Sequence, residues 1–306
     1  MKLNHLRDVV AVADRGGLRA AARHLDVAQP ALTRSLGEIE RELGASLFER
    51  GARGTTLTAT GQAFVARARS ILNEVRRAEE EVAQLNGGTG GRVSMALSIA
   101  SHIALLPAVL PAFRTRYPAA QLRIVEGIYA TVEAGLRDGE IDFYVGPEPW
   151  GGLAPDLVQE RLFTNTRVVL GRAGHPLAGV RTLAGLAGAE WATTSVTLRA
   201  DEELGELFRQ HGLPPPRLAL QSQSALTLIV ALASTDLLAM VPAQWQGFAP
   251  LATTLAIIPV QEVLPAPDIV LVRRAGLPLP PAATALVDLL RRAAAASVPA
   301  GRSPSQ

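Results

Sequence analysis

The sequence predicts a mixed α/β chain: a small helical N-terminal domain, a long connecting helix and a larger α/β domain. Three observations lead to this prediction. Short helical patterns fill residues 1–57, an apolar heptad runs through residues 58–86, and strand-forming segments alternate with helical segments after that. Such alternation is typical of a parallel sheet covered by helices. The length of 306 residues leaves room for at least two domains.

Composition excludes several functional classes. Apolar residues make up 48% of the chain and charged residues 19%, which is enough apolar material for a folded core. The absence of cysteine excludes disulfides, thiol catalysis, zinc fingers and iron–sulfur clusters. The longest apolar stretches fall short of the ~20 residues of a membrane helix, and residues 1–8 carry charges that a signal peptide would lack. We therefore expect a cytoplasmic protein with no membrane partner, no cofactor and no metal.

Positive charge is concentrated in the first quarter of the chain. Residues 1–70 carry 11 basic side chains against 7 acidic ones, whereas the remainder carries 19 against 21. This asymmetry is typical of a nucleic-acid-binding domain. Arginine supplies 29 of the 30 basic residues, and its planar fork suits phosphate and guanine. An arginine-rich coding bias is the simpler explanation of that preference.

Three short helices are predicted in the N-terminal domain. The first covers residues 3–14 and the second residues 18–25. The third begins at Gln29-Pro30, since proline is tolerated in a first helical turn, and stops at Gly44. Its apolar stripe is expected to be buried and consists of Leu32, Leu36, Ile39 and Leu43.

The polar face of the third helix has the side chains that read DNA bases. Gln29, Thr33 and Arg34 lie near its N-terminus, outside the apolar stripe. Glutamine can bond adenine twice, arginine can do so with guanine, and threonine offers a methyl group to thymine. A recognition helix contacts DNA with its N-terminal residues. A three-helix interaction module with a solvated face is the alternative. The candidate DNA contacts are Arg19, Gln29, Pro30, Thr33, Arg34, Arg50 and Arg53.

Residues 47–58 predict a β-hairpin beside these helices. Leu47, Phe48 and Leu57 can pin its ends to the helical core, which places Arg53 at the tip. A basic hairpin tip next to a recognition helix can reach the DNA backbone or the minor groove. A solvated loop charge is the alternative for Arg53.

Taken together, these segments resemble the LysR-type transcriptional regulators. The matching N-terminal segments are residues 18–25, 29–34, 39–44, 47–50 and 57–61, and the matching later segments are residues 111–118, 139–146 and 175–178. The resemblance therefore spans nearly the whole chain and implies a winged helix-turn-helix. Two departures concern helix caps. Ala28 and Gly17 stand where the family usually has serine or threonine, and loss of such a cap costs ~1 kcal/mol.

The long helix predicts a dimer seam. About 27 residues at ~1.5 Å each give a rod of roughly 40 Å, and Gly87–Gly91 after it predicts a flexible hinge. Packing against its own domain is the alternative. A dimer places two recognition helices on an inverted repeat in double-stranded DNA, and the resemblance implies a dimer of dimers. The unbroken heptad consists of Phe64, Ala68, Ile71, Val75, Ala78, Val82 and Leu85.

The C-terminal domain predicts two α/β lobes. Strands are expected over residues 93–99, 122–128 and 141–145, and the helix after the first strand is expected to begin only near Pro107 and to bend at Pro111. The resemblance implies a two-lobed, periplasmic-binding-protein-like effector domain. The boundaries are residues 1–58 for the DNA-binding domain, 59–87 for the linker helix and 88–306 for the effector domain, with lobe 1 at 91–162 and 268–300 and lobe 2 at 163–267.

Polar residues follow the predicted strands, where ligands of open parallel sheets bind. Hydroxyl and amide groups that converge there favour a small anion such as a carboxylate. Helix capping is the alternative for Ser101 and Ser224, and a structural role is the alternative for His102, which could titrate in the cleft. The candidate effector contacts are Ser98, Ala100, Ser101, His102, Tyr129, Thr131, Gly146, Pro147, Thr193, Thr194, Ser195, Gln223, Ser224, Val241 and Pro242.

Three rival functions are weighed against a regulator. An enzyme is disfavoured because the sequence has no nucleophile elbow, no phosphate-binding loop and no metal-ligand spacing among its histidines. A secreted solute-binding protein would not carry a DNA-reading domain. An architectural DNA binder would not need a large α/β domain. We therefore expect a non-enzymatic regulator whose effector changes the angle between the lobes, with the change passed through seam and hinge to DNA and RNA polymerase.

Overall fold

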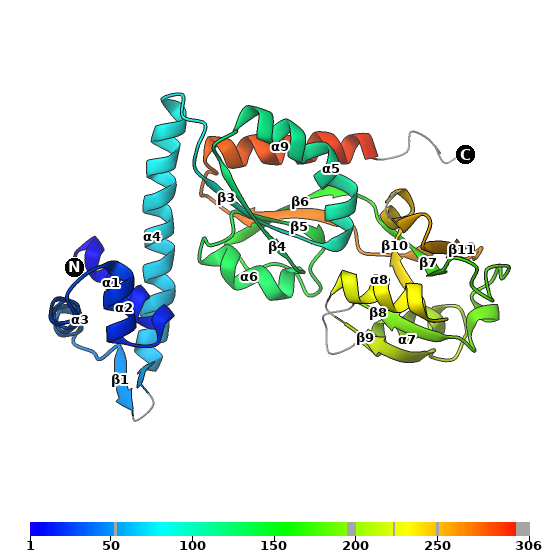
Figure 1. Cartoon of the computed structure of the whole chain (residues 1–306), viewed down its shortest axis with the longest axis horizontal. Helices are drawn as coiled ribbons and strands as arrows, with labels where there is room; N and C mark the ends of the chain where they lie inside the picture. The colour runs from blue at the N-terminus through cyan, green and yellow to red at the C-terminus, as the bar shows by residue number, and fades with distance from the viewer. Residues whose placement is uncertain (52–53, 195–199, 223, 249–250, 298–306) are drawn as a thin grey trace.

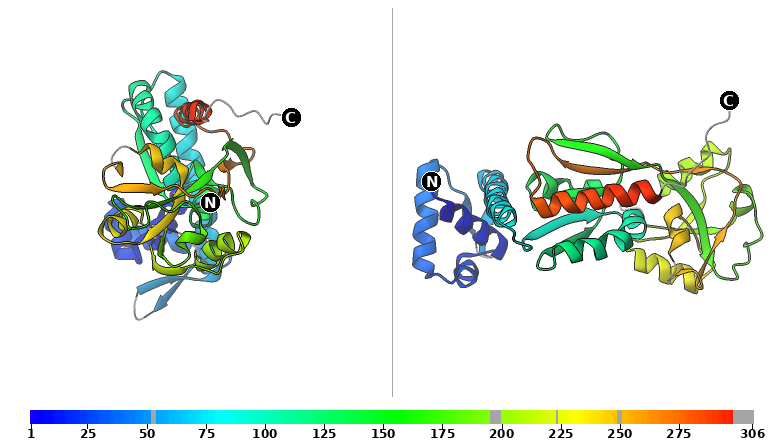
Figure 2. Two further views of the ribbon diagram at one scale, coloured as in Figure 1. Left: turned by 90° about the vertical axis from the view of Figure 1, so that its right-hand side faces the viewer. Right: turned by 90° about the horizontal axis from the view of Figure 1, so that it is seen from above.

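The computed structural model describes residues 1–51, 54–194, 200–222, 224–248 and 251–297. The chain is elongated (Figure 1): a small N-terminal domain lies against one end of the long helix α4, and an α/β domain of two lobes extends from the other side. Seen from above, the N-terminal domain, α4, the first lobe and the second lobe follow one another in a row (Figure 2).

The N-terminal domain has the three predicted helices and the predicted hairpin. They are α1 (Leu3–Arg15), α2 (Leu18–Leu25), α3 (Gln29–Leu43), β1 (Phe48–Gly51) and β2 (Gly54–Leu57). The prediction that Leu43 is buried was wrong. This side chain is 41% exposed, because it is the last helical residue and the chain turns away at Gly44 before another element covers it.

Helix α4 (Ala59–Leu85) begins at Thr58, whose hydroxyl accepts a hydrogen bond from the Gly61 amide at 2.9 Å. The predicted seam is split between two environments. Phe64 and Ala68 pack into the core of the N-terminal domain, so these two positions belong to the chain's own interior. The remainder of the stripe is largely open, with Val82 60% exposed and Leu85 71% exposed.

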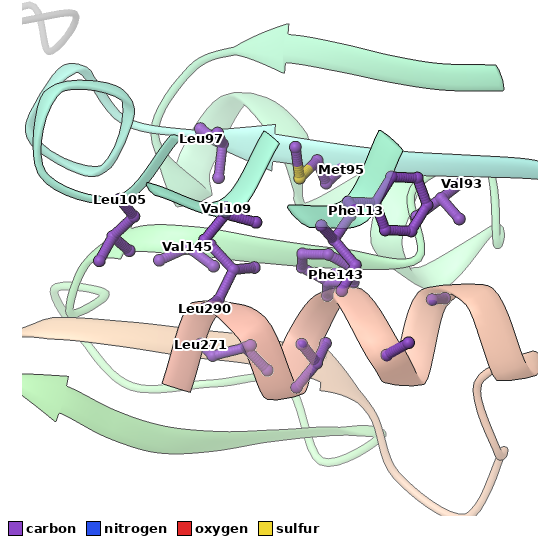
Figure 3. Close-up of a cluster of buried hydrophobic side chains, with 14 of the residues drawn as sticks. Val93, Met95, Leu97, Leu105, Val109, Phe113, Phe143, Val145, Leu271 and Leu290 are labelled. Atoms are coloured by element: carbon purple, nitrogen blue, oxygen red, sulfur yellow. The ribbon is translucent and has the colours of Figure 1, made fainter. Parts of the chain in front are cut away.

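The first lobe has a five-stranded sheet with the order β4-β3-β5-β13-β6. Its central strands β3, β4 and β5 are parallel, whereas β13 runs antiparallel to β5 and β6, so the sheet is mixed rather than purely parallel. Helices α5 and α9 cover one face, around the apolar cluster of Figure 3. The elements are β3 (Arg92–Leu97), α5 (Ile99–Arg116), β4 (Gln121–Glu126), α6 (Tyr129–Arg137), β5 (Phe143–Pro147), β6 (Leu157–Phe163), β13 (Ile269–Arg274) and α9 (Pro281–Ser297).

Helix α5 begins two turns earlier than its prolines suggest. The Ser98 hydroxyl accepts a hydrogen bond from the Ser101 amide at 3.3 Å and so caps a helix that includes Pro107 and Pro111. Both prolines are exposed, where solvent can bond the carbonyls that they leave free. Burial of the opposite face outweighs the lost bonds, and that face is formed by Leu105, Val109 and Phe113.

The second lobe has a sheet with the order β11-β7-β10-β8-β9, and β12 also pairs with β7. Strands β8, β9 and β10 are parallel. The chain enters this lobe between β6 and β7 and returns between β12 and β13. Its elements are β7 (Thr166–Arg172), η1 (Ala184–Leu186), β8 (Glu190–Thr193), α7 (Ala200–Gln210), β9 (Arg217–Gln221), α8 (Ala225–Ser234), β10 (Leu238–Pro242), η2 (Ala243–Gly247), β11 (Leu255–Ile258) and β12 (Leu264–Pro265). No helix in the described ranges is long and apolar enough to span a membrane.

Candidate nucleic-acid interface and effector cleft

The N-terminal half of α3 presents the predicted DNA-contacting side chains to solvent. Gln29, Pro30, Thr33 and Arg34 are all exposed, on the face opposite buried Leu32. The Thr33 hydroxyl donates to the Gln29 carbonyl at 3.0 Å, so its proton stays within the helix while its methyl group and oxygen lone pairs stay available. This helix end can therefore present polar and apolar contacts to a DNA groove.

Two helices begin without a side-chain cap, as their sequences predict. Ala28 precedes α3 and Gly17 precedes α2, and neither position supplies a capping oxygen. The Ala28 carbonyl accepts from the Ala31 amide at 2.9 Å. Both residues have extended backbones, so a serine or threonine would fit either position without strain.

The hairpin is fixed to α3 by a carboxylate that the sequence analysis missed. Glu40 accepts hydrogen bonds from the amides of Leu47 at 2.7 Å and Phe48 at 3.3 Å. Leu47 is fully buried and Phe48 packs on the same core. On α2, Arg19 is exposed as predicted. Two predicted contacts cannot be placed: Arg53 lies outside the described residues, as does the side chain of Arg50.

In the first lobe, the predicted effector hydroxyls are engaged in helix capping. Ser98 and Ser101 are buried, and their hydroxyl oxygens lie 3.0 Å apart. Ala100 is buried beside them, and Nδ1 of His102 lies 3.0 Å from the Ser98 carbonyl. The capping alternative therefore describes what both serines do in this structure.

The next group of predicted residues is engaged in local packing. Tyr129 is buried, with its ring centroid 6.3 Å from that of Tyr144. A Cβ atom on Gly146 would lie 2.1 Å from the Tyr144 hydroxyl oxygen, which leaves space only for glycine. That hydroxyl donates to the Pro147 carbonyl at 3.2 Å, and burial raises the pKa of Tyr144, which keeps the donor protonated. Thr131 is exposed and donates to the Ile128 carbonyl at 2.9 Å.

The second lobe contributes residues at the carboxyl ends of its strands. Thr193 and Thr194 are partly exposed after β8, Val241 is buried, and Pro242 pairs with β7. Ser224 caps α8 by accepting from the Thr227 amide at 3.3 Å. Ser195 and Gln223 lie outside the described residues.

The two lobes meet where α5 contacts η2. Ile99 and Ile103 from the first lobe pack against an apolar cluster of the second lobe that includes Val241 and Trp245. This contact brings the start of α5 and the end of β10 to opposite sides of one interface. In the part of the chain that the structure describes, a cavity of about 460 Å³ beside His175 and another of about 570 Å³ beside α4 both lie away from it.

One cation near the second sheet's cleft end was missed by the sequence analysis. Arg167 pairs with Pro242 and Leu264 in the sheet, and its guanidinium donates to the Pro265 carbonyl. Burial lowers the pKa of Arg167, which marks a partly desolvated charge. Nothing in the sequence distinguishes this arginine from the many exposed ones.

Comparison with known families matches both halves of the chain. Residues 3–62 match the model of the bacterial regulatory helix-turn-helix protein of the lysR family, and residues 86–295 match the LysR substrate binding domain. The chain belongs to the LysR family. It is a DNA-binding transcriptional regulator and not an enzyme.

Relatives of this LysR-family chain cover it almost end to end. The SDS degradation transcriptional activation protein of Pseudomonas sp. (strain ATCC 19151) is 30% identical over 94% of this chain and 95% of its own length. The regulator TdcA of Escherichia coli (strain K12) is 25% identical over 95% and 92%. Among solved structures, full-length CbnR complexed with its target DNA is 25% identical, covers 96% of this chain and 100% of its own, and superposes with a TM-score of 0.71.

Proposed function

We propose that this chain is a dimeric LysR-type regulator that binds an inverted-repeat operator and responds to a small anionic effector between its two lobes. The observation that carries the proposal is the exposed N-terminal half of α3 in a chain that matches the family over both domains. We divide the chain into residues 1–58, 59–87 and 88–306, with the first lobe at 91–162 and 268–300 and the second at 163–267.

Base contacts are assigned to the α3 face. Gln29 and Arg34 are the residues for bidentate contacts to adenine and guanine, and Thr33 is the residue for a thymine methyl group. Arg19, Arg50 and Arg53 are assigned to the phosphate backbone, which would position the domain without specifying sequence.

Dimerisation is assigned to the open part of α4. From Ile71 to Leu85, the heptad positions face away from the chain's own core, and the same stripe on a second copy would cover them. Two such dimers form the tetramer that we propose. A two-fold axis through this seam relates the two recognition helices and so requires two operator half-sites in opposite orientation.

The effector site is assigned to the lobe interface at α5 and η2. His102 on the first lobe and Thr193 and Thr194 on the second are the polar candidates that are not fully buried there. Arg167 adds positive charge at the same end of the second sheet, which supports an anionic ligand. A ligand that binds one arrangement of the lobes more tightly than the other would shift their equilibrium. We place this activity in the cytoplasm, with RNA polymerase as the recipient of the signal.

A DNase footprint on the DNA upstream of the protein's own gene tests the operator proposal. We expect two protected half-sites with inverted symmetry, and Arg34→Ala should remove protection at the half-site bases while Arg172→Ala, a substitution in the second lobe, should leave it unchanged. Equal binding of that DNA and random DNA across a salt series would instead mean that phosphate contacts alone hold the protein on DNA.

A further inference from the structure

The linker helix is joined to the first lobe by buried charges. Arg77 of α4 is 4% exposed, and Asp142 at the start of β5 is 3% exposed. The guanidinium of Arg77 donates to Asp142 Oδ1 at 2.6 Å and to the Gly139 carbonyl at 3.1 Å. The other carboxylate oxygen of Asp142 accepts from the Ser94 amide at 2.8 Å. Both ends of this ion pair are therefore satisfied inside the protein.

A second layer of contacts surrounds the pair. Glu74 accepts from Arg77 at 2.7 Å and also from Arg274 of β13. The Asn73 amide donates to the Asp138 carbonyl at 3.0 Å. Gly139 has a φ of +74°, and a Cβ atom there would lie 3.0 Å from the Arg274 guanidinium. The turn is thus shaped to admit two arginines, one from the helix and one from the sheet.

The glycine segment that follows α4 is also tied down. Gln84 donates to the Gly90 carbonyl at 2.8 Å and accepts from the Ala282 amide at 2.9 Å, which links α4 to both ends of the first lobe. The Gly88 amide bonds the Ala83 carbonyl at 2.9 Å. The segment that the sequence predicts to be a flexible hinge is a hydrogen-bonded turn in this structure.

We infer that residues Asp138, Gly139, Asp142 and Arg274, here called the linker socket, hold α4 in one orientation and make the linker helix and first lobe a single rigid unit. The polar contacts give this joint its direction, since a buried ion pair tolerates only one geometry. At the other end of α4, Val65 and Ala68 fix the N-terminal domain to the same helix. Arg77 and Asp142 are therefore positioning residues for the DNA-binding domains.

This arrangement changes the route of regulation, and that consequence rests on the proposed effector response. If the linker socket holds, the second lobe is the part of the chain that moves relative to the DNA-binding domains. The effector signal would then reach DNA through contacts of the second lobe with neighbouring copies, rather than through bending at residues 87–91. Loss of the socket would free the half-site spacing from control by the effector domain.

The test measures the orientation of α4 directly. Because the chain has no cysteine, cysteines introduced at exposed Ala63 and Ala130 carry spin labels for a pulsed electron–electron distance measurement, with excess unlabelled chain to suppress signals between copies. The test variant is Arg77→Met with Asp142→Asn. The matched control makes the same two changes in an ion pair of the second lobe, Arg172→Met with Asp236→Asn.

We expect a single narrow distance peak for the parent and the control, and loss of that peak in the Arg77→Met/Asp142→Asn variant. A broad distribution in the parent, or an unchanged peak in the variant, would overturn the inference. If the variant does not fold, Asn73→Ala with Gln84→Ala removes peripheral bonds and should also broaden the peak; an unchanged peak again overturns it. An absent operator footprint would count against the proposed function alone, since the distance measurement needs neither DNA nor effector.

Discussion

Adding a cap to the recognition helix should stabilise the N-terminal domain by a measurable amount. Replacing Ala28 by threonine introduces a hydroxyl at an extended position, φ −66° and ψ 131°. Pro30 has no amide hydrogen, so the hydroxyl oxygen has one free target in the first turn, the amide of Ala31. A single recovered cap of this kind is worth about 1 kcal/mol, and we expect that value for Ala28→Thr.

Amide hydrogen exchange of α3 in the full-length chain measures this gain. Tryptophan fluorescence would miss it, because Trp150, Trp191 and Trp245 all lie in the effector domain. A gain of about 1 kcal/mol corresponds to roughly five-fold slower exchange where amides open with the domain. The matched control is Ala28→Val, which has the shape of threonine without its hydroxyl. Equal exchange in the two variants would refute the capping argument, since the hydroxyl is their only difference.

Three further outcomes are expected. Arg34→Ala should weaken binding to the operator by ~1–3 kcal/mol with little change on random DNA, measured by fluorescence anisotropy; equal losses on both would remove base reading from this residue. Val82→Asp should convert the dimer to monomer in light scattering because it charges the open seam, whereas Ala83→Asp, on the neighbouring exposed position, should not. Thr194→Ala should weaken the response to effector and leave operator affinity unchanged, and a parallel loss of operator affinity would assign the residue a structural role.

Local signals were sufficient to predict the N-terminal domain. Pro30 in a first turn and the glycines after α1 and α3 mark helix ends without help from the rest of the chain, and the structure confirms them. The same kind of signal failed for α5. There the cap at Ser98 and the burial of Leu105 and Val109 against the sheet outweigh two prolines, and burial depends on strands that lie far away in the sequence.

Long-range polar contacts were beyond sequence reasoning. Arg77 lies in a run of charged residues that is typical of a solvated helix face, and its partner Asp142 is 65 positions away. The heptad identified one side of α4 but gave no sign that the other side is polar and buried. The effector candidates met a related limit. Strand ends could be located, but whether Ser101 caps a helix or binds a ligand depends on three-dimensional neighbours.

The division of α4 into an apolar side and a buried polar side has a physical logic. If the lobe-facing side were apolar as well, either side could pack on a partner or on the lobe, and the helix could rotate between them. Arg77 prevents this exchange, because turning it toward an apolar seam would leave its charge and that of Asp142 without partners, at a cost of several kcal/mol. The ion pair need not add net stability to do this. Its contribution is to make one orientation of the helix far less unfavourable than any other, which is what a fixed distance between two DNA-binding domains requires.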